Sequence, residues 1–183
     1  MNSPDLLNLI HHRQSQRSYT DQPVEKDKLE RCIEAARLAP SACNAQPWKF
    51  IIIDDPELKN AVADLATEKF TGMNHFTRQA PVHVAVVRES ANFSSAFGQV
   101  VKDKEYPLID IGIAVAHFCL QATAEGLSTC ILGWFNEKKV KSLLHVPANK
   151  RLELLVLVGY APDGKIRDKK RKATAAMLSY NRY

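Results

Sequence analysis

The segment from Pro107 to Glu125 is apolar on nearly all of its sides, and it constrains the fold more than any other part of the chain. A helix of this kind is stable only where protein surrounds it. Asp110, His117 and Gln121 lie within it and argue against a membrane-spanning segment. The sequence therefore predicts a long helix at the centre of a core or at a subunit interface, and Gly126 is expected to end it.

Two further apolar runs, Val82–Val87 and Leu152–Val158, predict strands that are covered on both faces. The second run is expected to be the central strand of its sheet. Phe50–Ile53 and Ser128–Leu132 are expected to form the other strands. Helices are expected to begin at three capping signals, namely Ser3–Pro4, Asp55–Pro56 and Asn136.

This alternation of strands and helices favours, on pattern alone, a doubly wound parallel sheet with a nucleotide site. The seven glycines, however, are too scattered to form a G-x-G-x-x-G motif or a P-loop. A Rossmann or P-loop enzyme is therefore not expected. The 183 residues are 45% hydrophobic and contain no linker or repeat, which predicts a single domain over residues 1–183.

The N-terminus has no basic region followed by an apolar run, which predicts a cytoplasmic protein with no membrane segment. The four cysteines form no C-x-x-C pair and have no histidine at metal-binding spacing. Reduced thiols and no metal site are therefore expected. Cys43 lies in a polar loop, where its thiol is either exposed and reactive or a small filler.

The formal net charge of +5 is concentrated in one short segment. Residues 165–172, Lys-Ile-Arg-Asp-Lys-Lys-Arg-Lys, hold six basic residues and one acid, so the rest of the chain is formally neutral. Such a local concentration of charge suits a discrete anion, for example a phosphate group, at least as well as a long polyanion.

A second basic pattern, Arg13-x-Ser15-x-Arg17, comes directly after the first expected helix. In an extended backbone these three side chains share one face, where two guanidinium groups and a hydroxyl could converge on a phosphate. Alone, the pattern is more typical of a solvated surface.

Residues 39–48, Ala-Pro-Ser-Ala-Cys-Asn-Ala-Gln-Pro-Trp, join an amphipathic helix to an apolar strand. The helix is indicated by residues that share one face: Leu29, Cys32, Ile33 and Ala36. Hydroxyl and amide groups in the loop could be directed at a ligand, although a simple connector is the favoured interpretation of the loop alone. Residues 67–78 and 89–106 also look irregular, and the second of these is either a lid over a site or a surface loop.

Four patterns occur in one order along the chain: Arg13-x-Ser15-x-Arg17, Pro40-Ser41-x-x-Asn44-x-Gln46-Pro47-Trp48, Gly133-Trp134 and Lys169-x-Arg171. Together they resemble the FMN-dependent nitroreductase family, and the resemblance covers nearly the whole chain. It implies an α+β fold in which helices flank a mixed β-sheet, and a two-fold homodimer with FMN at the interface. This implied fold replaces the doubly wound parallel sheet that the pattern alone suggests.

The resemblance also implies a role for each matching residue. The phosphate and ribityl chain of FMN are assigned to Arg13, Gln14, Ser15, Lys169 and Arg171. Arg17 matches a basic residue at the pyrimidine edge of the flavin, where a cation stabilises the reduced form. The loop that covers the flavin of the neighbouring subunit corresponds to Pro40, Ser41, Ala42 and Asn44. The backbone N–H groups facing the flavin correspond to Ile131, Leu132 and Gly133. Trp48 and Trp134 are expected to be packing anchors.

The implied function is that of an oxidoreductase that moves a hydride from NADH or NADPH to FMN and passes electrons to a nitroaromatic, quinone or similar small-molecule acceptor. No side-chain nucleophile is implied. One alternative is an FMN-binding module or a divergent flavoenzyme, such as a dehalogenase or a flavin-cleaving enzyme. A third hypothesis is nucleic-acid binding through Lys165–Lys172, but this segment has no interleaved aromatic residues, so no nucleic-acid partner is expected.

Overall fold

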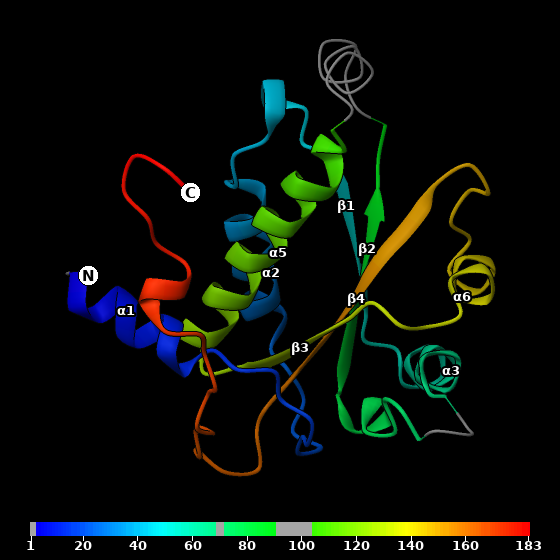
Figure 1. Cartoon of the computed structure of the whole chain (residues 1–183). Helices are drawn as coiled ribbons and strands as arrows, with labels where there is room; N and C mark the ends of the chain where they lie inside the picture. The colour runs from blue at the N-terminus through cyan, green and yellow to red at the C-terminus, as the bar shows by residue number, and fades with distance from the viewer. Residues whose placement is uncertain (1–2, 69–71, 91–103) are drawn as a thin grey trace.

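The chain folds around a four-stranded sheet with the strand order β1-β2-β4-β3 (Figure 1). The structure is a computed structural model that describes residues 3–68, 72–90 and 104–183. Its strands are β1 (Trp48–Ile53), β2 (Val82–Arg88), β3 (Ser128–Leu132) and β4 (Arg151–Gly159). The three strand pairs are antiparallel, so the parallel sheet suggested by the pattern alone is wrong. An isolated bridge between Ser15 and Thr129 adds a parallel pairing beside β3.

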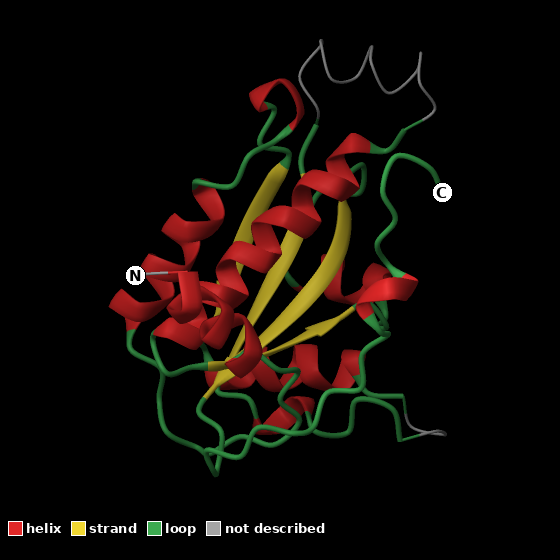
Figure 2. Ribbon diagram, turned by 60° about the vertical axis from the view of Figure 1, so that its left-hand side comes forward, coloured by secondary structure: helices red, strands yellow, loops and turns green. Residues whose placement is uncertain are grey.

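Helices cover both faces of this sheet (Figures 1 and 2). On one side lie α2 (Lys26–Arg37) and α5 (Tyr106–Ala124). On the other side lie α3 (Pro56–Ala66) and α6 (Glu137–Leu143). The architecture is therefore α+β, with an antiparallel sheet between two helical layers.

The helix-end signals in the sequence are confirmed. Asp55 accepts a hydrogen bond from the backbone N–H of Leu58 at 2.8 Å, and Asn136 accepts one from that of Lys139 at 3.1 Å. Gly126 has a positive φ of 77° just beyond α5, a backbone conformation that favours glycine and ends the helix.

The two faces of β2 explain why its sequence is continuously apolar. Val82, Val84 and Val86 pack in a core cluster with α2 and α5, whereas Ala85 and Val87 pack in a second cluster with α3 and α6. β4 lies between β2 and β3 and is buried in the same way over most of its length. The prediction of a central strand over 152–158 is therefore confirmed.

α5 is the long apolar helix that the sequence predicts. Its Phe118 is fully buried and stacks on Phe50 of β1, with 6.1 Å between the ring centroids. Among the described helices α5 alone is long and apolar enough to cross a membrane. It packs against both the sheet and α2, as a core helix does.

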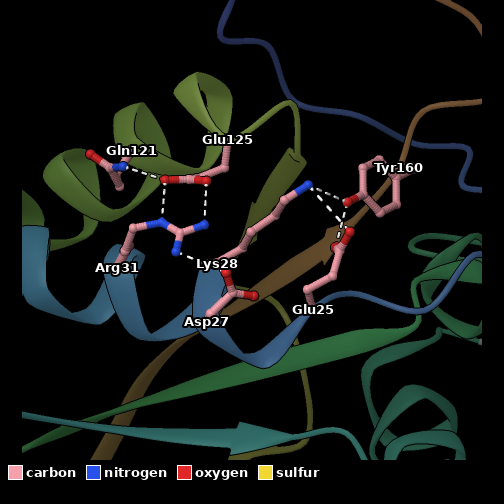
Figure 3. A network of polar contacts seen from close by, with 7 residues as sticks. All are labelled: Glu25, Asp27, Lys28, Arg31, Gln121, Glu125 and Tyr160. Atoms are coloured by element: carbon pink, nitrogen blue, oxygen red, sulfur yellow. Dashed lines mark hydrogen bonds and ion pairs between the residues drawn. The ribbon is translucent and has the colours of Figure 1, made fainter.

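A polar network joins α2 to the ends of α5 and β4 (Figure 3). Arg31 donates two hydrogen bonds to Glu125, at 2.7 and 2.8 Å, and these bonds lower the pKa of that carboxyl to about 2. The Tyr160 hydroxyl accepts from Lys28 at 2.7 Å and donates to Glu25 at 2.5 Å. The network holds the N-terminal half of α2 against the end of α5.

α1 (Ser3–His12) lies where the sequence predicts the first helix, directly before Arg13, and none of its residues is buried. In the segment 67–78, residues 69–71 lie outside the described part of the chain, and a short 3₁₀ turn, Thr77–Gln79, begins near its end. Most of the segment 89–106, for which the sequence left a lid and a surface loop as alternatives, lies outside the described residues. Of the cysteines, Cys32, Cys119 and Cys130 are buried and Cys43 is exposed.

Candidate functional site

A cavity of about 370 Å³ lies between two segments that are far apart in the sequence. Arg13, Gln14, Ser15 and Arg17 line it from the first segment, and residues 167–171 line it from the second. The second segment includes Lys169 and Arg171. With the four residues of the first segment, six of the cofactor ligands proposed from the sequence therefore line one cavity. The Arg-x-Ser-x-Arg side chains share a site, as the extended backbone predicts.

Backbone pairing with β3 fixes the first segment. α1 ends with a hydrogen bond from the Arg13 backbone N–H to the Leu9 carbonyl at 3.0 Å. The chain then runs beside β3, where Ser15 pairs with Thr129 and the Gln16 N–H donates to the Thr129 carbonyl at 2.9 Å. The side chain of Gln16 is buried, so the residues flanking it are left facing the cavity.

Side-chain contacts hold the second segment against the first. Gln14 Nε2 donates to the Lys165 carbonyl at 2.8 Å, and Gln14 Oε1 accepts from the Arg167 backbone N–H at 3.0 Å. Lys169 Nζ donates to the Arg13 carbonyl at 2.8 Å and also to the His11 carbonyl at the end of α1. Lys169 therefore helps to cap α1, where the helix dipole favours a cation. Arg167 was missed from the sequence, although the basic run that contains it was the available signal.

The cavity is strongly cationic. Asp168 is the single acidic residue in its lining, which holds six basic side chains: Arg13, Arg17, Arg167, Lys169, Lys170 and Arg171. Partial burial lowers the pKa of Lys169, and the nearby guanidinium groups of Arg13, Arg171 and Arg167 lower it further. This excess of positive charge fits a dianionic group, and guanidinium groups are suited to a phosphate.

The loop 39–48 has a strained backbone that the sequence did not reveal. Cys43, Asn44 and Gln46 all have positive φ angles, of 51°, 51° and 47°. Such conformations are costly for residues other than glycine and cluster at functional sites. The Gln46 backbone N–H donates to Ser41 Oγ at 3.0 Å, so this hydroxyl stabilises the turn.

Asp110 anchors the loop and was missed as a site residue from the sequence. It lies on α5 and is only 4% exposed, and its carboxylate accepts from the Ala42 backbone N–H at 3.1 and 3.2 Å. The sequence showed a carboxylate in an apolar helix, but no pattern that linked it to position 42. The contact fixes the loop to the first turns of α5.

The loop does not line the cationic cavity of its own chain. Pro40, Ser41, Ala42 and Asn44 lie at the end of α5 that is remote from α1 and the 13–17 segment (Figure 1). The third proposed group lies at the end of β3, where Leu132 is buried whereas Ile131 and Gly133 are exposed. A ligand held in the cavity therefore has β3 within the same chain, whereas the loop of that chain lies away from it.

Trp134 is exposed rather than a packing anchor, so that expectation is wrong. Its side chain is 63% exposed beside a hollow of about 670 Å³ next to α3 and α6. Its backbone is held in place, because Asn74 Nδ2 donates to the Trp134 carbonyl at 3.0 Å and to the Ala66 carbonyl at 3.1 Å. Trp48, in contrast, packs against the core cluster of α2 and α5.

Comparison with known proteins accounts for this combination of fold and site. A family model described as the nitroreductase family matches residues 10–160. The matched region includes the 13–17 segment, the loop 39–48 and all four strands. The chain belongs to the nitroreductase family.

Individual relatives agree with this assignment. The chain is 30% identical to an Archaeoglobus fulgidus protein named as an NADH dehydrogenase/NAD(P)H nitroreductase, with 88% of each chain covered. It is 26% identical to the iodotyrosine deiodinase of Drosophila melanogaster over 87% of its own length, but it spans only 63% of that protein. The crystal structure of a nitroreductase family protein from Clostridium novyi is 30% identical, covers 89% of this chain and 88% of its own, and superposes with a TM-score of 0.74. The nitroreductase-like fold is thus confirmed.

Proposed function

We propose that this protein is an FMN-dependent oxidoreductase that takes reducing equivalents from NADH or NADPH and passes them to a nitroaromatic, quinone or similar electron-poor acceptor. The observation that carries the proposal is the cationic cavity between residues 13–17 and 167–171. A phosphate monoester carries about −1.5 to −2 charges at neutral pH, which the surrounding cations can neutralise. The name of the Archaeoglobus fulgidus relative supports the reductant and the acceptor class.

Each group of residues has a proposed task toward the cofactor. Arg13, Ser15, Lys169 and Arg171 are proposed to hold the phosphate, in a cavity whose wall Gln14 helps to form. Arg17 is exposed at the end of its segment and is proposed to place positive charge at the pyrimidine edge of the flavin. The end of β3, residues Ile131, Leu132 and Gly133, is proposed to offer backbone N–H groups to the ring. Bound FMN supplies the electron-transfer chemistry, and the chain supplies orientation and charge.

The acceptor arm of the proposal is tested by turnover with a panel of acceptors. NADH or NADPH oxidation by the FMN-loaded protein is measured with a nitroaromatic, a quinone and iodotyrosine. Faster oxidation with the nitroaromatic or the quinone than with buffer alone is expected. Release of iodide with no acceleration by the other two acceptors would instead favour the dehalogenase alternative, which the similarity to iodotyrosine deiodinase keeps open.

We also propose that the protein acts as a homodimer in which the loop residues Pro40, Ser41, Ala42 and Asn44 cover the flavin held by the partner. α1 supports this proposal, since it buries nothing within its own chain while it exposes apolar side chains, among them Leu7 at 58%. Apolar residues near the C-terminus, Met177 and Leu178, are exposed as well. A second subunit would cover these surfaces and complete the site.

The substitution Leu7→Glu is expected to shift the protein from dimer to monomer and to reduce the amount of FMN retained. A carboxylate at the centre of an apolar interface is costly to bury. Size-exclusion chromatography with light scattering gives the mass, and absorbance gives the flavin content. Asn149→Glu, at an exposed turn before β4, is the charge-matched control and should remain dimeric. A dimeric Leu7→Glu variant with full flavin content would contradict the interface.

Nucleic-acid binding through Lys165–Lys172 is the least supported function. Gln14 and Ser15 bind Arg167, and Lys169 binds backbone carbonyls near Arg13, so this segment is engaged within the chain. Those contacts favour a small anion over an extended polyanion. We propose a cytoplasmic protein with a small-molecule acceptor and with neither a nucleic-acid nor a membrane partner.

A further inference from the structure

We propose that Gln14 and Arg167 form a latch that docks the C-terminal basic segment, residues 165–172, and that closure of this latch is coupled to binding of a phosphate group in the cationic cavity. Gln14 then acts as a positioning residue and does not contact the phosphate itself. The inference rests on the proposed function, because it takes the phosphate of FMN as the ligand.

The contacts of the Gln14 amide carry the proposal. Its Nε2 donates to the Lys165 carbonyl at 2.8 Å, and its Oε1 accepts from the Arg167 backbone N–H at 3.0 Å and from Arg167 Nε at 3.4 Å. Arg167 Nη2 returns a hydrogen bond to the Ser15 carbonyl. Both ends of the amide are thus committed to the C-terminal segment. A side chain engaged in this way holds the cavity wall in place rather than the ligand.

Burial contributes little to docking this segment. Residues 162–183 are all exposed except Lys169, which is half-buried. The segment therefore lacks the apolar contacts that hold the rest of the fold together. Its docking depends on polar contacts, and the latch joins it to the strand-like segment that carries Arg13 and Ser15.

Electrostatics supplies the coupling. Docking brings Arg167, Lys169 and Arg171 into one cavity with Arg13, where their like charges repel one another. Because the Gln14 amide is neutral, it can attach the segment and leave the positive charge of the cavity intact, whereas a carboxylate would partly neutralise that charge. A phosphate dianion in the cavity converts the repulsion into attraction. Because coupling is reciprocal, a ligand that stabilises docking must also bind more weakly when docking is impaired.

The test is hydrogen exchange of the peptide that spans 163–172, measured by mass spectrometry together with the FMN dissociation constant. Four full-length proteins are compared: wild type, Gln14→Ala, Gln14→Glu and the exposed-glutamine control Gln22→Ala. Each is measured with no ligand, with inorganic phosphate and with FMN. The wild-type peptide is expected to exchange more slowly with either ligand. Gln14→Ala should exchange faster without ligand and bind FMN roughly 5- to 50-fold more weakly, a range typical of coupling between sites. Gln22→Ala should match the wild type.

Gln14→Glu separates docking from ligand contact. Its carboxylate can still accept hydrogen bonds from Arg167, so the peptide should stay protected without ligand, whereas the added negative charge should weaken FMN binding. Weaker FMN binding in Gln14→Ala with unchanged exchange would make Gln14 a direct ligand and overturn the latch. Faster exchange with unchanged FMN affinity would overturn the coupling. In a further outcome, none of the four proteins, the wild type included, binds FMN, but phosphate still slows exchange of the 163–172 peptide in the wild type and not in Gln14→Ala. The latch then stands and the proposed function fails.

Discussion

Replacement of Arg13 by alanine is expected to weaken FMN binding by about 1.5–3 kcal/mol, or roughly 10- to 150-fold, which is the range for a hydrogen bond to a charged group. Arg13 lines the cationic cavity directly after α1, at a position fixed by its backbone N–H bond to Leu9 and by the Lys169 contact to its carbonyl. In the proposed site, loss of its guanidinium removes one cationic hydrogen-bond donor from the phosphate. Arg171→Ala is expected to act in the same way from the other wall of the cavity.

Flavin fluorescence titration of the apoprotein measures this effect. The matched control is Arg37→Ala at the end of α2, where the guanidinium is exposed and pairs with Glu34 at 2.6 Å, away from the cavity. The control should bind FMN like the wild type. An Arg13→Ala protein that folds normally and retains wild-type affinity would refute the phosphate assignment.

The second large effect concerns stability at acid pH. His83 on β2 is fully buried, and its Nε2 lies 3.0 Å from the Thr77 carbonyl. Its pKa is lowered to about 4, chiefly by burial; the hydrogen bond to Thr77 acts in the opposite direction, and the nearby ammonium of Lys59 adds to the lowering. In the unfolded chain its pKa returns to about 6.5. The unfolded state thus binds the proton more tightly, and stability falls as the pH decreases from about 6.5 to 4.

The linkage amounts to about 3 kcal/mol over this interval. Replacement of His83 by glutamine keeps an N–H donor for the Thr77 carbonyl but removes the titrating ring. Urea unfolding at pH 7 and pH 4 is therefore expected to show a smaller loss of unfolding free energy in His83→Gln than in the wild type. The exposed-histidine variant His75→Gln is the control and should lose as much stability as the wild type. An equal loss in all three proteins would show that His83 does not control the acid response.

Local patterns predicted the elements well because the chemistry that defines them is local. The apolar runs 82–87 and 152–158 became the two strands buried on both faces, and the capping residues Asp55 and Asn136 became helix starts. The relative direction of neighbouring strands, in contrast, does not follow from local sequence. Without the family resemblance, the alternation of helices and strands favoured a parallel sheet, whereas the strand pairs are antiparallel.

Site residues that depend on long-range contacts could not be predicted. The carboxylate of Asp110 binds the Ala42 backbone 68 positions earlier, and Arg167 binds Gln14 from 153 positions away. No periodicity connects such positions, because the fold alone brings them together. Trp134 was misjudged for a related reason, since a large aromatic residue after an apolar strand is usually buried, but here the chain ends its strand at a surface turn.

The central claim, that this chain binds FMN and reduces it with a nicotinamide, is tested most directly by the visible absorbance spectrum of the purified protein. The spectrum is recorded without oxygen, after the addition of FMN and removal of the excess, and again after the addition of NADH or NADPH. A retained flavin spectrum that bleaches with at least one of the two nicotinamides is the predicted result. A protein that retains no flavin, or that holds a flavin which neither nicotinamide bleaches, would contradict the account.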